Sequence, residues 1–248
     1  MAHMTGVERI RNILARKPVD RIGLFEHFWG DTLAEWTAQG HIAEGESLAD
    51  HFGFDLQTVG VCNMIADTDF EPVVVDETEE TVLTRDGNGA LLRRSKTHDA
   101  TPEHVDFLVQ NRPGWEEHIK PKLTADPARI DFETYRNARR NATEQDRYFF
   151  WAGTGAFELM HPVCGHEHML VGMAIDPGWV QDMVHNYTRL TIELLEILFA
   201  EEGVPDGLWI YEDMGFKQRP FFSLDTYRQI IQPGHKALID FAKSKGLQ

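Results

Sequence analysis

The short run HPVCGHEH brings together three histidines, a cysteine and a glutamate, side chains that ligate metals or transfer protons. In an unbroken helix His161, Cys164 and His168 would share one face, a spacing that suits zinc. Pro162 and Gly165 argue against an unbroken helix at this point. We therefore expect a helix break with a buried cysteine here rather than a metal site.

Two adjacent carboxylates, Glu212 and Asp213, lie near the carboxyl end of the apolar run 206–215. Paired carboxylates can divide acid and base roles or bind a substrate. Neighbouring strand residues point to opposite faces, so only one of the two can face a site, and the pattern leaves open which one. We take both as catalytic candidates and Lys217 as a substrate contact. The plainer interpretation is an ion pair with Lys217 or Arg219.

Two further sets of polar and aromatic side chains come at the end of, or just after, the apolar runs 21–29 and 147–155, which are expected to be strands. The carboxyl ends of parallel strands share one edge, so these side chains would meet at a common rim. The plainer interpretations are aromatic rings that plug a barrel end and a hydrogen-bonded core histidine. The expected substrate-binding residues are Glu26, His27, Trp29, Phe157, Glu158 and His161.

The order of the expected elements indicates an α/β fold. Strand-like runs at 21–29, after Gly53, at 147–155 and at 206–215 alternate with helices, the clearest of which spans Pro177 to about Glu201. This alternation predicts the first four βα units of a (β/α)8 TIM barrel, a fold that places its active site at the carboxyl ends of its strands.

A hairpin is expected to interrupt this alternation. Asp86-Gly-Asn-Gly89 lies between two β-rich runs, which is a strong hairpin signal. We interpret residues 70–97 as a hairpin inserted into a single partial barrel domain that spans residues 1–248.

The composition excludes several classes of protein. The 248 residues carry a formal net charge of −16, which disfavours nucleic acids and polyanionic substrates. No run approaches the 18 or so apolar residues of a membrane span. The two cysteines, Cys62 and Cys164, lie far apart in the sequence. They indicate a reducing compartment, such as the cytoplasm, without a disulfide framework.

The run AGTGAFELMHPVCGHEHMLVGMAIDPGWVQDMV resembles the uroporphyrinogen decarboxylase superfamily. In that superfamily a glycine-ended strand precedes a helix, a Gly-x-Glu turn and a helix that opens at Asp-Pro. The segments ERIRNILARKPVDRIGLFEHFWG and LWIYEDMGFKQRPFFSLDTYRQIIQPGHKALIDFAKSKG agree as well, so the resemblance covers essentially the whole chain. The matching positions of the first run are Gly153, Gly155, Gly165, Glu167, Asp176 and Pro177.

The resemblance implies a (β/α)8 barrel and one of two chemistries. The superfamily contains true uroporphyrinogen decarboxylases and zinc-dependent methyltransferases, which exchange methyl groups with a corrinoid protein, a thiol or a phenol ether. The decarboxylases follow their first strand with Met-Arg-Gln-Ala-Gly-Arg-Tyr, whereas this chain has Phe25-Glu-His-Phe-Trp29 without an arginine. A site lined by Glu26, Glu212 and Asp213 would repel a polycarboxylate. We therefore favour a methyltransferase, with a decarboxylase or a non-catalytic half-barrel assembly module as alternatives.

The methyltransferase branch takes its zinc from a His-x-Cys motif on the fifth strand and from a later cysteine. This chain ends at Gln248, where that strand is expected to begin, so the resemblance implies zinc at the barrel mouth with ligands outside this chain. We assign no metal ligand within it, and whether the chain alone is an active enzyme stays open. The implied corrinoid would be carried by a partner protein. Besides that protein and a small-molecule substrate, we expect a second copy or the missing half-barrel to cover the exposed apolar face.

Overall fold

A three-stranded parallel sheet forms the centre of the computed structural model, which describes residues 3–247. Its strands β1 (Leu56–Val59), β6 (Tyr148–Thr154) and β7 (Gly207–Tyr211) lie in the order β1-β6-β7. Because β6 pairs in parallel with both neighbours, the three carboxyl ends share one edge of the sheet. The described residues therefore form an open sheet with β1 and β7 at its edges, and the barrel is not closed.

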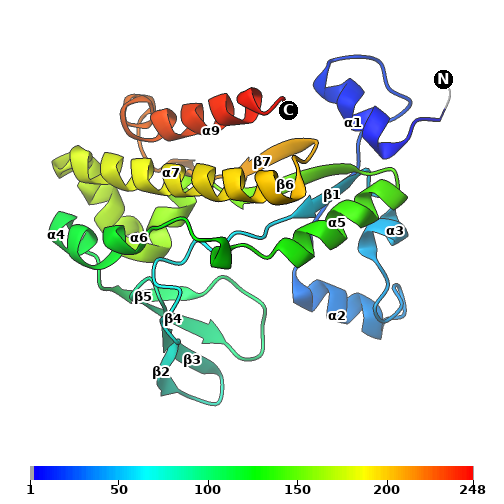
Figure 1. Ribbon diagram of the computed structural model, residues 1–248. Coiled ribbons are helices and arrows are strands. Elements are labelled where there is room, and N and C mark those ends of the chain that lie inside the picture. Colours follow the sequence, from blue (N-terminus) through cyan, green and yellow to red (C-terminus); the bar gives the residue numbers. More distant parts are fainter. Residues whose placement is uncertain (1–2, 248) are drawn as a thin grey trace.

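Long helices cover one face of this sheet (Figure 1). They are α5 (Phe132–Glu144), α6 (Ala156–Ile175), α7 (Pro177–Glu202) and α9 (Gln232–Ser244). The predicted helix from Pro177 to about Glu201 is confirmed. Its proline stands in the first turn, where the absent N–H leaves no hydrogen bond unmade. An apolar face of α7 repeats along the helix and fills the core.

Shorter elements complete the fold. The helix α1 (Gly6–Leu14) begins with a capping box, in which Thr5 and Glu8 satisfy each other's backbone N–H groups. A small hairpin, β8 (Gly215–Phe216) with β9 (Arg219–Pro220), follows the last strand of the parallel sheet. The remaining helical segments are α2 (Gly30–Ala38), α3 (Leu48–Phe52), α4 (Arg112–Gly114), η1 (Trp115–Ile119), η2 (Lys120–Lys122), η3 (Pro127–Arg129), α8 (Leu224–Thr226) and η4 (Tyr227–Ile231).

Alternate side chains of the strands enter different environments. Phe149 and Trp151 of β6 join the main core beneath the helices, whereas Tyr148 and Phe150 face the opposite side of the sheet. On that opposite side the ring of Phe25 contacts Phe150 at 5.5 Å between centroids. The sheet therefore has one face sealed by helices and one face only partly covered.

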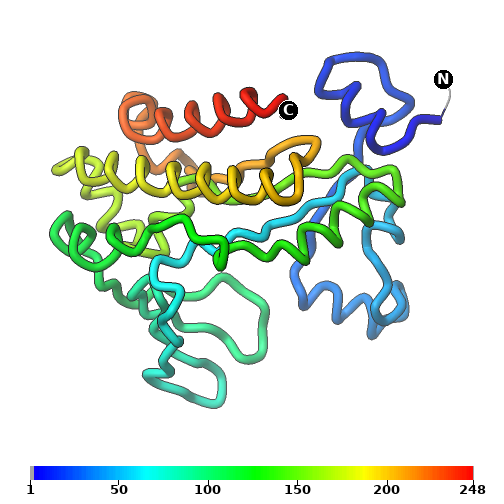
Figure 2. The backbone as a smooth tube through the Cα atoms, viewed as in Figure 1, coloured from blue at the N-terminus to red at the C-terminus, as the bar shows by residue number. Residues whose placement is uncertain are grey.

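The segment 21–29 corrects one expectation, because it is not a strand. It joins α1 to α2 and can be followed in blue along the backbone (Figure 2). The backbone of Leu24 lies beside the residue that precedes β1, where the Leu24 carbonyl accepts a hydrogen bond from the Asp55 amide. The Leu24 amide, in turn, is taken by the Asp55 carboxylate at 2.8 Å. Since a side chain intercepts the donor that a ladder needs, the apolar run does not add a fourth parallel strand.

A second, antiparallel sheet stands apart from the parallel one at the lower left of Figure 1. It contains β2 (Val73–Glu77), β3 (Thr81–Arg85), β4 (Ala90–Ser95) and β5 (Glu103–Phe107) in sequence order. The predicted hairpin at DGNG is confirmed as the β3–β4 turn. Two outer strands extend the hairpin on both sides: β2 lies within the predicted 70–97 segment, whereas β5 lies beyond it and was not predicted.

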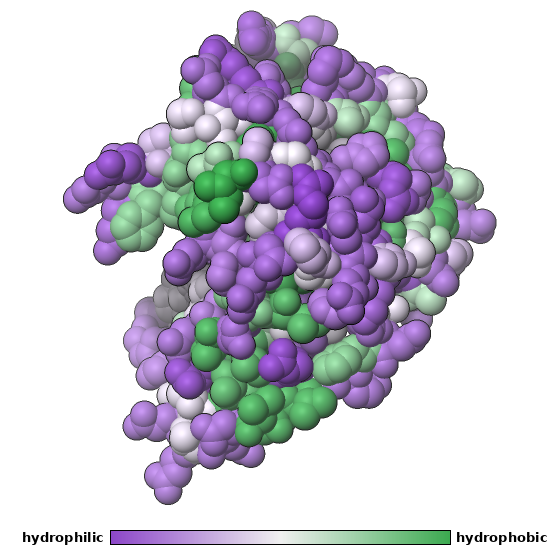
Figure 3. Space-filling model, turned by 90° about the vertical axis from the view of Figure 1, so that its left-hand side faces the viewer, coloured by the Kyte–Doolittle hydropathy of each residue, from purple (hydrophilic) through white to green (hydrophobic). Residues whose placement is uncertain are grey.

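The four-stranded sheet carries part of the exposed apolar surface. The side chains of Val73, Val74 and Val75 on its edge strand are all about half exposed, at 51%, 56% and 54%. Figure 3 shows apolar atoms gathered over the lower part of the molecule, at the height of this sheet. Among the described residues, no helix is both long and apolar enough to cross a membrane.

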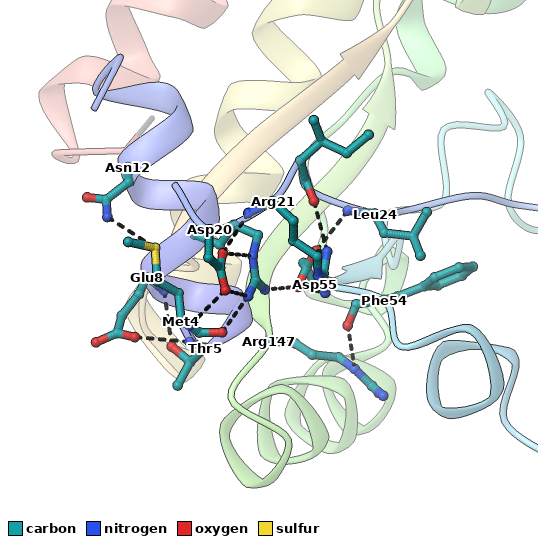
Figure 4. Close-up of polar contacts among 12 residues, drawn as sticks. Met4, Thr5, Glu8, Asn12, Asp20, Arg21, Leu24, Phe54, Asp55 and Arg147 are labelled. Carbon is teal, nitrogen blue, oxygen red and sulfur yellow. Dashed lines mark hydrogen bonds and ion pairs between the residues drawn. The ribbon is translucent and has the colours of Figure 1, made fainter. Parts of the chain in front are cut away.

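The amino-terminal end of the parallel sheet is held by buried ion pairs (Figure 4). Arg9, with 1% of its side chain exposed, donates to Asp20 at 2.7 Å and to Asp55 at 2.5 Å. Arg21 pairs with the second oxygen of Asp55 at 2.6 Å. The hydrogen bonds from Arg9 hold the pKa of Asp20 well below its usual range. This network fastens α1 and the following loop to the start of β1.

Candidate functional site at the carboxyl ends of the strands

Glu212 is buried under the amino terminus of α6, directly after β7. Its carboxylate accepts hydrogen bonds from the backbone amides of Phe157 at 3.2 Å and Glu158 at 2.8 Å, as an N-terminal cap does. Gly155 makes this possible, because a Cβ there would lie 2.1 Å from Glu212 Oε1. Glu212 thus closes the end of the helix and does not face the open side of the sheet.

A chain of two further side chains supports Glu212 from behind. His235 of α9 lies with Nε2 at 2.9 Å from Glu212 Oε1, and Tyr227 Oη lies 3.0 Å from His235 Nδ1. An ionised carboxylate can only accept, so we assign the proton to Nε2 and let the tyrosine hydroxyl donate to Nδ1. All polar groups of this chain are then paired.

Asp213 points the other way, and this resolves which of the two acids faces the open side of the sheet. Leu208 and Ile210 pack toward the main core, whereas Trp209 and Tyr211 are exposed on the opposite face. Alternation places Glu212 with the first pair and Asp213 with the second. Burial and the nearby charges of Asp213 and Glu158 raise the pKa of Tyr211, in keeping with this placement.

The two strand tails are clamped to each other by reciprocal hydrogen bonds. The Glu158 amide donates to Glu212 Oε2 at 2.8 Å, and the Asp213 amide donates to Glu158 Oε1 at 3.2 Å. Each segment therefore supplies one backbone donor and one carboxylate acceptor to the other. The position of the Glu158 carboxylate is fixed by the backbone after β7 as well as by its own helix.

Glu158 and His161 form a carboxylate–imidazole pair one turn apart on α6. Glu158 Oε2 lies 2.6 Å from His161 Nε2, and both side chains are 14% exposed. Burial opposes ionisation of Glu158, but the hydrogen bond from His161 outweighs burial and lowers the pKa of Glu158. The ionised carboxylate fixes the proton on Nε2, which leaves Nδ1 as the proton acceptor. That buried nitrogen has no hydrogen-bond partner within residues 3–247.

Two other imidazoles sandwich His161. The ring of His166 stacks on it at 4.4 Å between centroids, and the ring of His104, from β5, stacks at 5.5 Å. Burial lowers the pKa of both His104 and His166. We call His104, His161 and His166 the imidazole stack. The lowered pKa values favour neutral rings at His104 and His166, on either side of the His161 ring that Glu158 holds.

The HPVCGHEH run lies within α6 and behaves partly as expected. The helix continues through Pro162 but is broken at Gly165, where φ is 71°. A Cβ at Gly165 would lie 2.4 Å from the ring of Phe107, so this glycine also lets β5 approach. Cys164 is fully buried, and burial raises the pKa of its thiol to about 12. Within residues 3–247, no group of three or more His, Cys, Asp or Glu side chains is arranged to hold a metal.

Some expected site residues lie away from this cluster. Glu26, His27 and Trp29 are exposed in the segment before α2, because the strand that was to carry them to the rim does not form. Lys217 is exposed in the β8–β9 turn, and within the described chain no ion pair joins Lys217 or Arg219 to Glu212 or Asp213.

Phe157 is brought to the cluster but is fully buried. Its ring contacts those of Phe221, Phe222 and His166 at 6.0, 5.4 and 6.1 Å, so it forms the apolar floor beneath the imidazole stack. Its backbone amide, rather than its ring, contributes the polar contact to Glu212.

Four residues of this cluster were not predicted from the sequence as site residues. His104 lies in a short polar strand, and His166 was seen only as part of a metal-like run. His235 was interpreted as a surface or packing residue, and Tyr227 was not considered. One sequence signal was available for Tyr227 and His235. Their spacing places both side chains toward one side of a helical segment, which can then face Glu212, the acid that follows a strand.

Comparison with known proteins gives a fold but no family. No protein-family model matches the sequence, and no curated protein matches it. The fold is similar to that of a methyltransferase from Methanosarcina mazei. The superposition has a TM-score of 0.55 at 13% sequence identity and covers 99% of this chain and 68% of the other. At this identity the likeness concerns the fold alone.

Proposed function

We propose that this chain is the catalytic part of a methyltransferase of the uroporphyrinogen decarboxylase superfamily. It would move a methyl group between a small substrate and a corrinoid protein or a thiol. The observation that carries the proposal is the Glu158–His161 pair, 2.6 Å apart at the carboxyl ends of β6 and β7. The similarity in fold to a methyltransferase supports the choice of chemistry.

Glu158 and His161 would handle the proton that methyl transfer releases. When a thiol accepts a methyl group, its S–H proton passes to His161 Nδ1 and its sulfur takes the methyl group. The donor keeps the electron pair of the broken bond. Glu158 orients the imidazole and stabilises the positive charge that develops on it. Because Nδ1 is shielded by neighbouring rings, a ring of the imidazole stack must move before a substrate reaches it.

The open face of the parallel sheet supplies the substrate surface. Trp209 and Tyr211 are about half exposed there, at 48% and 51%, and Asp213 lies at the end of the same row. Aromatic faces suit a small apolar or cationic group. The carboxylates of Glu158 and Asp213 disfavour a polycarboxylate, which weakens the alternative of a tetrapyrrole decarboxylase.

Zinc does not fit the residues that the structure describes. The nearest set, His161 and His166, has its rings stacked face to face, and no group of three or more suitable side chains converges within residues 3–247. A zinc ion of this class would need ligands from elsewhere, and the proton-transfer role of Glu158 and His161 does not depend on one.

A partner protein is the proposed carrier of the corrinoid, whose cobalt supplies or accepts the methyl group. We also propose that a second copy or a further half-barrel covers the edges β1 and β7. An apolar groove of about 210 Å³ between β7 and α9, lined by Leu208, Ile210 and Leu238, favours such a cover. The same open edges support the alternative of a non-catalytic assembly module. Sedimentation analysis distinguishes a covered oligomer from a stable monomer.

A model methyl transfer tests the proposal. The full chain is mixed with methylcobalamin as donor and 2-mercaptoethanol as acceptor, and the loss of the methylcobalamin absorbance is followed. We expect turnover that falls about 100-fold or more in His161→Gln, the range for removal of a general base. The matched control is His185→Gln, an exposed histidine on α7. Absence of turnover above the reaction without protein, also with zinc added, would overturn the proposal.

A further inference from the structure

We infer that His235 and Tyr227, both more than 50 residues beyond the end of α6 in the sequence, are positioning residues for the Glu158–His161 pair. The inference rests on the proposed function only in naming that pair as the acid–base group. The juxtaposition itself is a continuous path of hydrogen bonds from α9 and η4 to the imidazole of His161.

The first half of the path fixes Glu212. Tyr227 orients His235, and His235 donates to Glu212 Oε1 at 2.9 Å. The carboxylate is buried, with 6% of the side chain exposed, and has no room to rotate because Gly155 already lies against it. A buried carboxylate that loses one of its donors must find another or shift, so His235 helps to fix the position of Glu212 together with the Phe157 and Glu158 amides.

The second half transfers that position to Glu158. Glu212 Oε2 holds the Glu158 amide at 2.8 Å, and the Asp213 amide holds Glu158 Oε1 at 3.2 Å. Two atoms of Glu158 are thus tied to adjacent residues of the β7 tail. Displacement of Glu212 would move both ties, and with them the 2.6 Å contact to His161.

The five side chains of this path differ in their roles. Glu158 and His161 leave one nitrogen, Nδ1, without a partner, as a group that exchanges a proton requires. Tyr227, His235 and Glu212 have every polar atom paired with one another or with the backbone of α6. Tyr227, His235 and Glu212 thus form a fully paired set of side chains behind the partly paired Glu158 and His161. Such an outer set holds a reactive group in position without itself reacting.

Proton NMR of the full chain tests the inference without substrate or activity. The Nε2–H protons of His161 and His235 are each bound to a buried carboxylate and should resonate far downfield. They are assigned by their disappearance in His161→Gln and His235→Phe. In His235→Phe we expect the His161 proton to exchange with water about tenfold faster, the factor for loss of one hydrogen bond in the path. Tyr227→Phe should produce a smaller increase.

Three controls separate positioning from a general loss of structure. The indole proton of Trp115, bound to Asp182 at 2.7 Å on another part of the molecule, serves as an internal reference and should keep its exchange rate. His235→Gln, whose amide can still donate to Glu212, should restore most of the protection. His185→Gln should change nothing.

An unchanged His161 exchange rate in a folded His235→Phe variant would overturn the inference. An equal acceleration at Trp115 would overturn it too, because it would show global loosening. If His235→Phe fails to fold, Tyr227→Phe decides: faster exchange at His161 supports the inference, and an unchanged rate contradicts it. Failure of methyl transfer with a positive NMR result would count against the proposed function alone.

Discussion

The two ends of the parallel sheet treat their charged groups differently. At the amino-terminal end, Arg9 and Arg21 satisfy Asp20 and Asp55 through several short contacts, with Arg9 fully buried. At the carboxyl-terminal end, His161 keeps an unpartnered nitrogen among the described residues. A fully paired network rigidifies a scaffold, whereas an incompletely paired one retains capacity to bind or exchange protons. The paired Arg9–Asp20–Asp55 network supports stability at its end, where Nη1 of the neighbouring Arg147 is the buried nitrogen without a partner among the described residues, and the Glu158–His161 pair is the group suited to chemistry at the other end.

The largest expected effect on stability comes from breaking the amino-terminal network of ion pairs. Arg9→Met should remove the cation that Asp20 shares with the buried Asp55, leave Asp55 with Arg21, and lower the free energy of unfolding by about 3 kcal/mol. Urea denaturation measures this. Arg11→Met is the matched control on the same helix, because the Arg11 side chain is 59% exposed, and it should cost at most about 1 kcal/mol. Equal losses in the two variants would contradict the assignment of stability to the buried network.

Substitution of Gly155 tests the carboxyl-terminal end by crowding. A Cβ 2.1 Å from Glu212 must displace that carboxylate, so Gly155→Ala should destabilise the fold by about 1 to 3 kcal/mol. It should also abolish the downfield proton of His235. Gly215→Ala is the control, since no atom lies within 4 Å of its Cβ position. A tolerated Gly155→Ala with the His235 signal intact would refute the capping role of Glu212.

Acidification should act on the imidazole stack and on the paired carboxylates in different pH windows. The folded state lowers the pKa of His104 and His166, so below about pH 6.5 the unfolded chain binds more protons and stability falls as the pH falls. Asp20 also has a lowered pKa, but its contribution is lost only below about pH 4, where the unfolded carboxylate protonates.

Urea midpoints measured from pH 7.5 to 3 should therefore decline in two stages. His104→Phe, which keeps an aromatic ring but cannot be protonated, should flatten the upper stage and leave the lower stage unchanged. A single-stage decline, or an upper stage that persists in full in His104→Phe, would show that the imidazole stack does not control the upper window.

The smallest expected effect on stability belongs to Asp213→Asn. The side chain is exposed, and its clamp contact uses the backbone amide, so the free energy of unfolding should change by less than about 0.5 kcal/mol. Methyl transfer to 2-mercaptoethanol should nevertheless fall, because Asp213 faces the substrate surface. Glu212→Gln should show the opposite balance, with a measurable loss of stability. Similar losses of stability in both variants would contradict the division of roles between the two acids.

The elements with local signals were predictable. The helix from Pro177 shows its apolar period and its first-turn proline in the sequence, and DGNG specifies the β3–β4 turn. The run 21–29 misled because its composition suits a strand, while the Asp55 side chain occupies the amide that a ladder would use. The outer strand β5 is short and polar, so its pairing depends on its neighbour rather than on its own residues.

The candidate site was predictable in part for the same reason. Glu158 and His161 are one helical turn apart, so their contact follows from local spacing. The contact of His104 with His161 depends on how the antiparallel sheet docks, which no local pattern encodes. The role of His235 becomes visible only once Glu212 is known to point inward, a choice that the alternating strand pattern left open.

The missing side chain at Gly165 has a consequence for the whole antiparallel sheet. Phe107, at the end of β5, occupies the space that a Cβ would fill, and the same glycine bends α6. The backbone at Gly165 thus determines both the direction of α6 and the place where the end of β5 packs against it. Even an alanine at this position would push Phe107 and the end of β5 away from α6. His104, on the same strand, would then move away from His161.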